Sequence, residues 1–185
     1  MTATASVPRP LRAADPRLAP WRAFVIAHAR VWRRLDDDLR VEHGLSLSEY
    51  EALLLLAQSD GRRLRMRVLA EDLQLSKSGV TRLVDRLVDD GLVERGQCTT
   101  DARGAEAVLT EAGLNRLRAA APTHLRGIQA YFLDAIEVMD LAAVERAMRA
   151  VGEGLPTGPF ARAGRSSATL ECAPLETAAQ AAHEA

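Results

Sequence analysis

Apolar side chains recur at helical spacing along much of this chain. Over residues 21–39 they return every three or four positions, which predicts one amphipathic helix, and Gly44 suits the left-handed residue that ends such a helix. Ser46 and Glu49 then form the S-x-x-E capping box that begins a helix, here with a strongly apolar body over residues 50–57. Two successive helices, the second of them buried, are therefore expected.

The helical pattern becomes shorter in the next part of the chain. A basic link over residues 62–67 precedes an expected short helix over residues 68–73. Ser76 is a good N-cap for a further helix that reaches Asp90, and Gly91 stops this helix. The sequence thus predicts two helices separated by a tight turn.

Two strand-like segments follow, over residues 92–95 and 106–109, and the Gly- and Thr-rich stretch between them predicts the tip of a hairpin. A short helix, a tight break, a second helix and a hairpin in succession form the layout of a winged helix-turn-helix. That fold places its second helix in the major groove of DNA. The sequence therefore predicts a mainly α fold (α+β) with a small β-hairpin wing.

Helical periodicity returns after the hairpin. A long helix is expected from Glu111, with Pro122 kinking or breaking it before it resumes to Ile136, and a last helix is expected over residues 141–151. The whole pattern predicts a flexible arm at 1–17, one domain at 18–152, and a mostly disordered tail rich in Ala, Gly, Ser and Pro at 153–185.

The composition fits one helical domain, and the sequence shows neither a secretory signal nor a membrane-spanning segment. Hydrophobic residues make up 48% of the 185 residues and aromatic residues only 4%, so Leu, Val and Ala must fill the core. The net charge is −1, although residues 62–103 hold nine Lys and Arg against seven Asp and Glu. We expect a cytoplasmic protein with no membrane partner, because the sequence has neither a secretory signal nor an apolar run of about 20 residues.

The helix that begins at Ser76 has an apolar side and a polar face. Its apolar residues from Val80 to Leu87 share one side, whereas Ser, Thr and Arg side chains point the other way. Arg can hydrogen-bond guanine, hydroxyl groups can reach bases or phosphates, and the free N–H groups at the start of a helix favour a phosphate. An ordinary amphipathic helix with a solvated face would give the same pattern. The predicted DNA contacts are Ser76, Lys77, Ser78, Thr81, Arg82, Arg86 and Arg103.

The expected hairpin tip carries Asp101 and Arg103. An Arg at a narrow tip can enter a minor groove, where the negative potential of DNA is strongest. Asp101 is expected to hold a neighbouring Arg and to stiffen the tip, with Arg95 as a second supporting residue, although a simple surface ion pair is the alternative. A helix-turn-helix followed by a basic hairpin is much more specific for DNA binding than either feature alone.

Residues from about 45 to 136 resemble the MarR family of bacterial transcription regulators. The resemblance covers over half of the chain, in the order and with the spacing of the family. It is carried by the segments LSKSGVTRLVDRL (75–87), GLVER (91–95), DARG (101–104), LTEAG (109–113) and PTH (122–124).

This resemblance implies a homodimer in which the N- and C-terminal helices, here 18–43 and 111–152, interlock, with the winged helix-turn-helix at about 46–110. It also implies that the winged helix-turn-helix domains of the two copies bind a near-palindromic site on double-stranded DNA. Most family members repress nearby genes until a small molecule, often phenolic or aromatic, binds between the dimer helices and the winged helix-turn-helix. Arg67, expected just before the 68–73 helix, departs from the Ser or Thr usual in the family.

Four side chains are candidates for an effector pocket: Trp21, His28, Trp32 and Tyr50. Aromatic residues at helical spacing more often form a core or a dimer interface, which is the preferred alternative. Cys98 in the wing leaves a redox-responsive regulator open as an alternative function. A winged-helix protein interaction module without a DNA function is another.

The sequence offers little chemistry beyond binding. His28, His43 and His124 lack the spacing of metal ligands, so no metal ion or cofactor is expected. No nucleotide-binding glycine loop or GxSxG motif is present, so the chain is not expected to be an enzyme. Taken together, the sequence favours a homodimeric, ligand-responsive repressor that binds DNA.

Overall fold

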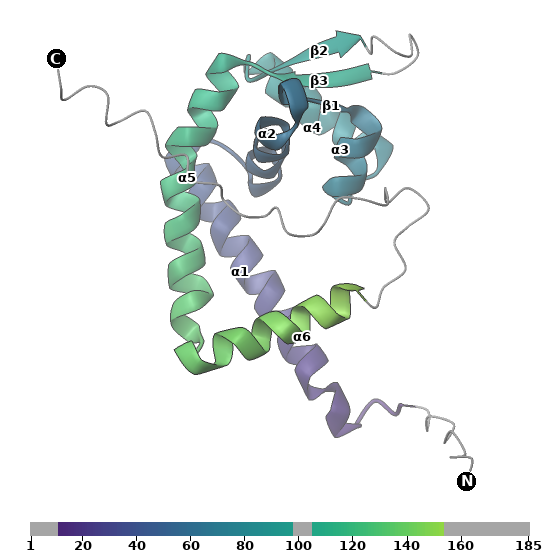
Figure 1. Cartoon of the computed structure of the whole chain (residues 1–185), viewed down its shortest axis with the longest axis vertical. Coiled ribbons are helices and arrows are strands. Elements are labelled where there is room, and N and C mark those ends of the chain that lie inside the picture. The colour runs from purple at the N-terminus through teal and green to yellow at the C-terminus, as the bar shows by residue number, and fades with distance from the viewer. Residues whose placement is uncertain (1–10, 98–104, 154–185) are drawn as a thin grey trace, which may run out of the picture.

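The computed structural model describes residues 11–97 and 105–153 of the chain. It is mainly helical with one small antiparallel sheet, which confirms the predicted fold class (Figure 1). The helices are α1 (Ala19–His43), α2 (Leu47–Gln58), α3 (Met66–Asp72), α4 (Lys77–Asp89), α5 (Glu111–Tyr131) and α6 (Leu141–Glu153). The strands are β1 (Arg63–Arg65), β2 (Val93–Gln97) and β3 (Ala105–Leu109).

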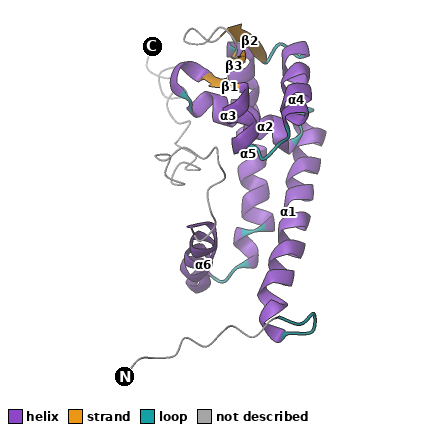
Figure 2. Ribbon diagram, turned by 90° about the vertical axis from the view of Figure 1, so that its right-hand side faces the viewer, coloured by secondary structure: helices purple, strands orange, loops and turns teal. Residues whose placement is uncertain are grey.

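The elements form two regions, which we call the lobe and the stem. The lobe comprises residues 45–97 and 105–110 and gathers α2, α3, α4 and the sheet at one end of the molecule (Figure 1). The stem comprises α1, α5 and α6. In it α1 and α5 run side by side away from the lobe, and α6 follows the far end of α5 (Figure 2).

The helix ends predicted from the sequence are confirmed. Gly44 takes a left-handed φ of 66° after α1, and Gly91 takes 69° after α4. At the start of α2 the Ser46 hydroxyl accepts from Glu49 N at 3.2 Å, and Glu49 Oε2 accepts from Ser46 N at 2.9 Å, which completes the capping box. Ser76 caps α4 by accepting from Gly79 N at 3.1 Å.

The expected basic link at 62–67 is wrong, because part of it is a strand. Strand β1 pairs antiparallel with β3 and gives the sheet order β1-β3-β2. Leu64 faces Ala107 across this pair, and both side chains are buried, at 6% and 0% exposure. The strand was not predicted because it contains a single buried residue, Leu64, between two arginines. One apolar residue is not enough to show the alternation that indicates a strand.

Pro122 was expected to kink or break the long helix, and the break is wrong. Although Pro122 has no N–H to donate to the Arg118 carbonyl and its ring crowds that carbonyl, helix α5 continues through this proline. Ala120, Ala121 and Thr123 are all buried next to it, and this packing holds the helix together. The helix ends at Tyr131 rather than at Ile136, because Phe132 leaves helical geometry at φ −124°.

Helix α3 begins two residues earlier than expected, at Met66. Arg67 therefore lies inside the helix and not before it, and Arg65 occupies the N-cap position. The Arg67 guanidinium pairs with Glu71 one turn later, at 2.8 Å. The departure from the family at Arg67 thus does not remove a helix cap.

The apolar core lies in the lobe and in the parts of the stem that adjoin it. Leu53, Leu69 and Leu87 from three lobe helices are each 0% exposed. Within the described residues, α1 buries only Leu35 and Leu39, and α6 buries none of its residues. The lobe is therefore a packed body, whereas much of the stem is open on the surface.

Candidate nucleic-acid interface

Helix α4 packs on the lobe with its apolar side turned inward. Val80, Leu83, Val84 and Leu87 are buried at 0–3% exposure, which confirms the apolar stripe predicted for this helix. Full burial of each such side chain contributes about 1.5–3 kcal/mol. The stripe therefore fixes the rotation of α4 about its axis and turns the polar face toward solvent.

The N-terminal end of this polar face consists of short hydroxyl side chains. Ser76 and Ser78 are exposed, and their hydroxyl oxygens lie 3.2 Å apart. The Thr81 hydroxyl donates to the Lys77 carbonyl at 2.8 Å, which leaves its oxygen free to accept further hydrogen bonds. These groups can contact phosphates or bases without moving the helix backbone.

Lys77 and Arg82 place two cations on the same exposed face. Among the residues that the structure describes, neither side chain has an ion-pair partner. Their charges are thus not compensated by any acidic side chain in the described part of the lobe. An uncompensated Lys at a helix start and an Arg one turn further suit a phosphate and a base edge, respectively.

Two further arginines proposed for DNA contact or wing support, Arg86 and Arg95, form ion pairs within the lobe. Arg86 donates through Nε to Glu49 of α2 at 2.8 Å. Arg95 of β2 pairs with Asp85 of α4 at 2.5 Å. This second pair neutralises an acidic side chain on α4 and joins the wing strand to the helix. Sequence reasoning missed both pairs, because their partners lie 37 and 10 residues away.

Three sequence candidates lie outside the described residues. They are Asp101 and Arg103 of the expected wing tip, and Cys98 of the redox alternative.

The candidates for an effector pocket do not come together in one place. Trp21, Phe24, His28 and Trp32 form a row along exposed faces of α1, with successive ring centroids 6.1, 6.0 and 4.8 Å apart. Trp21 is 61% exposed and Trp32 44%. Tyr50 is 1% exposed and belongs to the lobe core.

Tyr50 instead packs against His124 of α5, with ring centroids 4.5 Å apart. Burial lowers the pKa of His124 below its usual value. Its buried Nδ1 has no hydrogen-bond partner among the described residues. A neutral imidazole therefore lies where α5 of the stem meets α2 of the lobe.

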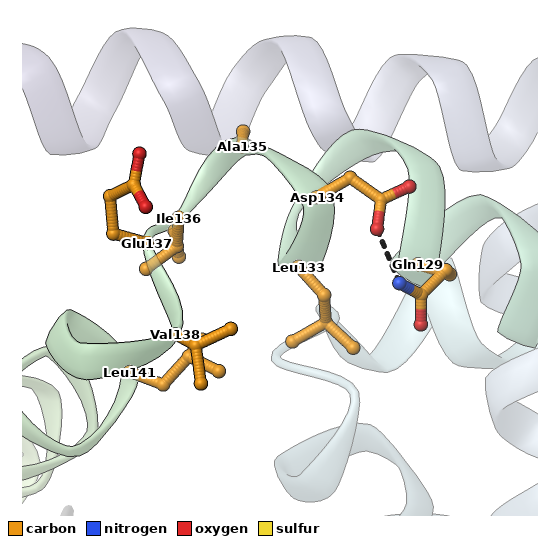
Figure 3. Close-up of a pocket in the computed structure, with 8 residues that line it drawn as sticks. All are labelled: Gln129, Leu133, Asp134, Ala135, Ile136, Glu137, Val138 and Leu141. Carbon is orange, nitrogen blue, oxygen red and sulfur yellow. Dashed lines mark hydrogen bonds between the residues drawn. The ribbon is translucent and has the colours of Figure 1, made fainter.

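A pocket of about 500 Å³ lies between the end of α5 and the start of α6 (Figure 3). Leu133, Ile136 and Leu141 supply apolar surface, and Gln129 hydrogen-bonds Asp134 at its edge. None of the four candidates for an effector pocket lines it.

The described residues contain no group of three or more His, Cys, Asp or Glu side chains placed to hold a metal ion. Within the same ranges, every helix is too short or too polar to cross a membrane.

Known proteins resemble this chain in sequence. A model described as the MarR family matches residues 43–104. The HTH-type transcriptional repressor YetL of Bacillus subtilis (strain 168) is 36% identical over 87 residues, which make up 47% of this chain and 52% of that repressor. The chain thus matches about half the length of this curated relative.

Solved structures match over a longer stretch. AbsC of Streptomyces coelicolor, a MarR family transcriptional regulator, is 34% identical with a TM-score of 0.70, over 79% of this chain and 97% of AbsC. Sco3205 of the same organism, also a MarR family regulator and solved in complex with DNA, is 33% identical with a TM-score of 0.73, over 83% of this chain and 94% of Sco3205. These relatives are transcriptional regulators, as the sequence predicted, and not enzymes.

Proposed function

This chain belongs to the MarR family of transcriptional regulators, and we propose that it binds double-stranded DNA through the exposed face of α4. The observation that carries this proposal is a pair of cations, Lys77 and Arg82, without ion-pair partners in residues 11–97 and 105–153, on a helix whose opposite side is buried. The DNA complex of Sco3205 supports it, since this chain covers 94% of that regulator. In the wing, the sequence expectation for Arg103 is part of the same proposal.

We further propose that the protein acts as a homodimeric repressor in the cytoplasm, with two copies on a near-palindromic operator. Exposed apolar side chains outside the aromatic row, such as Ile26 of α1 and Met148 of α6, support the dimer, since large exposed apolar patches mark interaction sites. The description of YetL as a repressor supports the sign of regulation.

Selection of bound duplexes from a random pool tests the DNA proposal and yields the operator. With that duplex, Arg82→Ala is expected to lower affinity at least about tenfold, the effect of losing a bidentate base contact. Lys77→Ala is expected to reduce the slope of log affinity against log salt by about one, as for a lost phosphate contact. Arg118→Ala, which removes an exposed Arg on α5, is the matched control. Equal affinity of the Arg82 and Arg118 variants would refute the assignment of α4 as the helix that contacts DNA bases.

A small-molecule effector is proposed to bind along the aromatic row of α1, formed by Trp21, His28 and Trp32. Exposed aromatic faces suit stacking with a phenolic or aromatic ring. Quenching of tryptophan fluorescence by simple phenols and benzoates, compared between the parent and Trp32→Leu, measures this contact. An identical response of the two proteins would show that the row does not bind the ligand.

A further inference from the structure

Arg86 stands on α4, but its guanidinium turns toward the neighbouring helix. Its Nε donates to Glu49 Oε1 of α2 at 2.8 Å, and one terminal nitrogen donates to the Arg82 carbonyl at 3.3 Å. The Glu49 side chain is only 11% exposed, whereas that of Arg86 is 57% exposed. The cation is therefore paired with a largely buried carboxylate, in contrast to Lys77 and Arg82.

Both oxygens of Glu49 are occupied. Oε1 accepts from Arg86, and Oε2 accepts from the backbone nitrogen of Ser46 at 2.9 Å as part of the capping box. Burial by itself would raise the pKa of Glu49, but the hydrogen bonds from Ser46 and Arg86 outweigh it and hold the pKa below its usual value. Glu49 is thus a charged and immobile anchor for Arg86 at neutral pH.

The same end of α2 is also tied to the stem. Asp36 of α1 accepts from the backbone nitrogen of Leu47 at 2.8 Å through Oδ1, and its Oδ2 pairs with Arg40 at 2.6 Å. The first turn of α2 therefore receives one carboxylate from α1 and offers another to α4. A change in the position of α1 can reach α4 through this turn.

We propose that Arg86 affects DNA affinity by pairing with Glu49 and so holding α4 in place on the first turn of α2, and not by contacting a phosphate itself. The proposal rests on the proposed function, and it gives Arg86 a positioning role that the sequence did not suggest. Because Glu49 neutralises its charge, Arg86 contributes little to counterion release from DNA. Arg82, one turn earlier and without an ion-pair partner among the described residues, is the group that this pair orients.

A double-mutant cycle on the full-length chain tests the proposal with Glu49→Gln, Arg86→Gln and the double variant. Gln is accepted at the third position of a capping box, so Glu49→Gln keeps the cap of α2 and removes only the ion pair. Each single variant is expected to bind the selected duplex about tenfold more weakly, with the salt slope of the parent. The double variant is expected to be no weaker than the weaker single variant, since both changes break one interaction.

Affinities are measured well below the midpoint of thermal unfolding, which is determined for every variant, so that lost stability does not count as lost binding. The proposal is overturned if Arg86→Gln lowers the salt slope by about one and its effect persists in full beside Glu49→Gln, as for a direct phosphate contact. It is also overturned if Arg86→Gln binds like the parent. In both cases the parent still binds DNA and the proposed function stands. A parent that binds no duplex would remove the proposed function and this inference together.

Discussion

The lobe and the stem differ in how completely one chain buries its apolar side chains. In the lobe, Leu53, Leu69 and Leu87 are 0% exposed. In the stem, Ile26 of α1 remains 51% exposed, and Met148 of α6 remains 44% exposed. The lobe thus buries its apolar side chains within one chain, whereas the stem presents the kind of exposed apolar surface that a second copy would cover. Stability of the lobe should depend on its own packing, whereas stability of the stem should rise with protein concentration if the proposed dimer forms.

The largest expected loss of stability comes from a substitution at Gly113, where α5 meets the lobe. A Cβ on Gly113 would lie 2.1 Å from the Leu92 carbonyl oxygen, and this backbone atom cannot yield without moving β2. We expect Gly113→Ala to lower the free energy of unfolding by about 3 kcal/mol or more. Denaturant unfolding measures it.

Gly127→Ala is the matched control in the stem part of α5. A Cβ there would lie 2.6 Å from Cδ2 of Leu35, the far end of a flexible side chain. Part of the cost is offset by the better helix propensity of Ala, so the expected loss is about 1 kcal/mol or less. Equal losses at the two glycines would mean that the lobe and stem ends of α5 do not differ in rigidity.

A smaller effect on stability, but a clear one on assembly, is expected for Val144→Asp. Val144 lies on the apolar side of α6 with Leu141 and Met148, at a spacing that places the three on one face. A charge in a buried interface is costly, so the dissociation constant of the proposed dimer should rise at least about tenfold. Sedimentation equilibrium measures it, and far-UV circular dichroism should show that the lobe stays folded.

Ala150→Asp introduces the same charge on the opposite side of α6 and serves as its control. Its dimer should match that of the parent. Equal dissociation by both aspartates would argue against α6 as part of the proposed interface.

The smallest expected effect is a pH dependence at the boundary of the two regions. Burial lowers the pKa of His124 in the folded chain, so the unfolded chain binds the additional proton as the pH falls through its usual value of 6.5. His124 therefore lowers stability on going from pH 7 to pH 5. His124→Phe keeps a ring against Tyr50 without a titrating group, and its midpoint of thermal unfolding should fall less over this range. A parent and variant with parallel pH profiles would contradict this role.

The features that the sequence predicted correctly are those set by neighbouring residues. Ser46 with Glu49, Ser76 and Gly91 mark the limits of α2 and α4 through local hydrogen bonds and backbone geometry. The apolar stripe of α4 follows in the same way from its spacing.

The features that were missed depend on distant partners. Strand β1 exists because β3 pairs with Arg63–Arg65 more than 40 residues later in the chain. Helix α5 survives Pro122 because buried neighbours hold it, and Arg86 turns inward because Glu49 of another helix receives it. No local pattern carries such information. The sequence therefore predicted the exposed face of α4 but not the ion pairs that join α4 to α2 and β2.

The pairing of α1 with α5 has a consequence for how the chain folds during its synthesis. Tyr131 donates to Asp38 across 93 residues, and Thr123 joins Glu42 across 81. At about 5–20 residues per second, the ribosome needs roughly 5–20 s to make α5 after α1 has emerged. Residues 45–110 are made in that interval, while α1 lacks its partner helix and exposes Leu35, which lies next to Gly127 of α5 in the folded chain. Helix α1 is thus made first, but it can pair with α5 only after residues 45–110 have been synthesised.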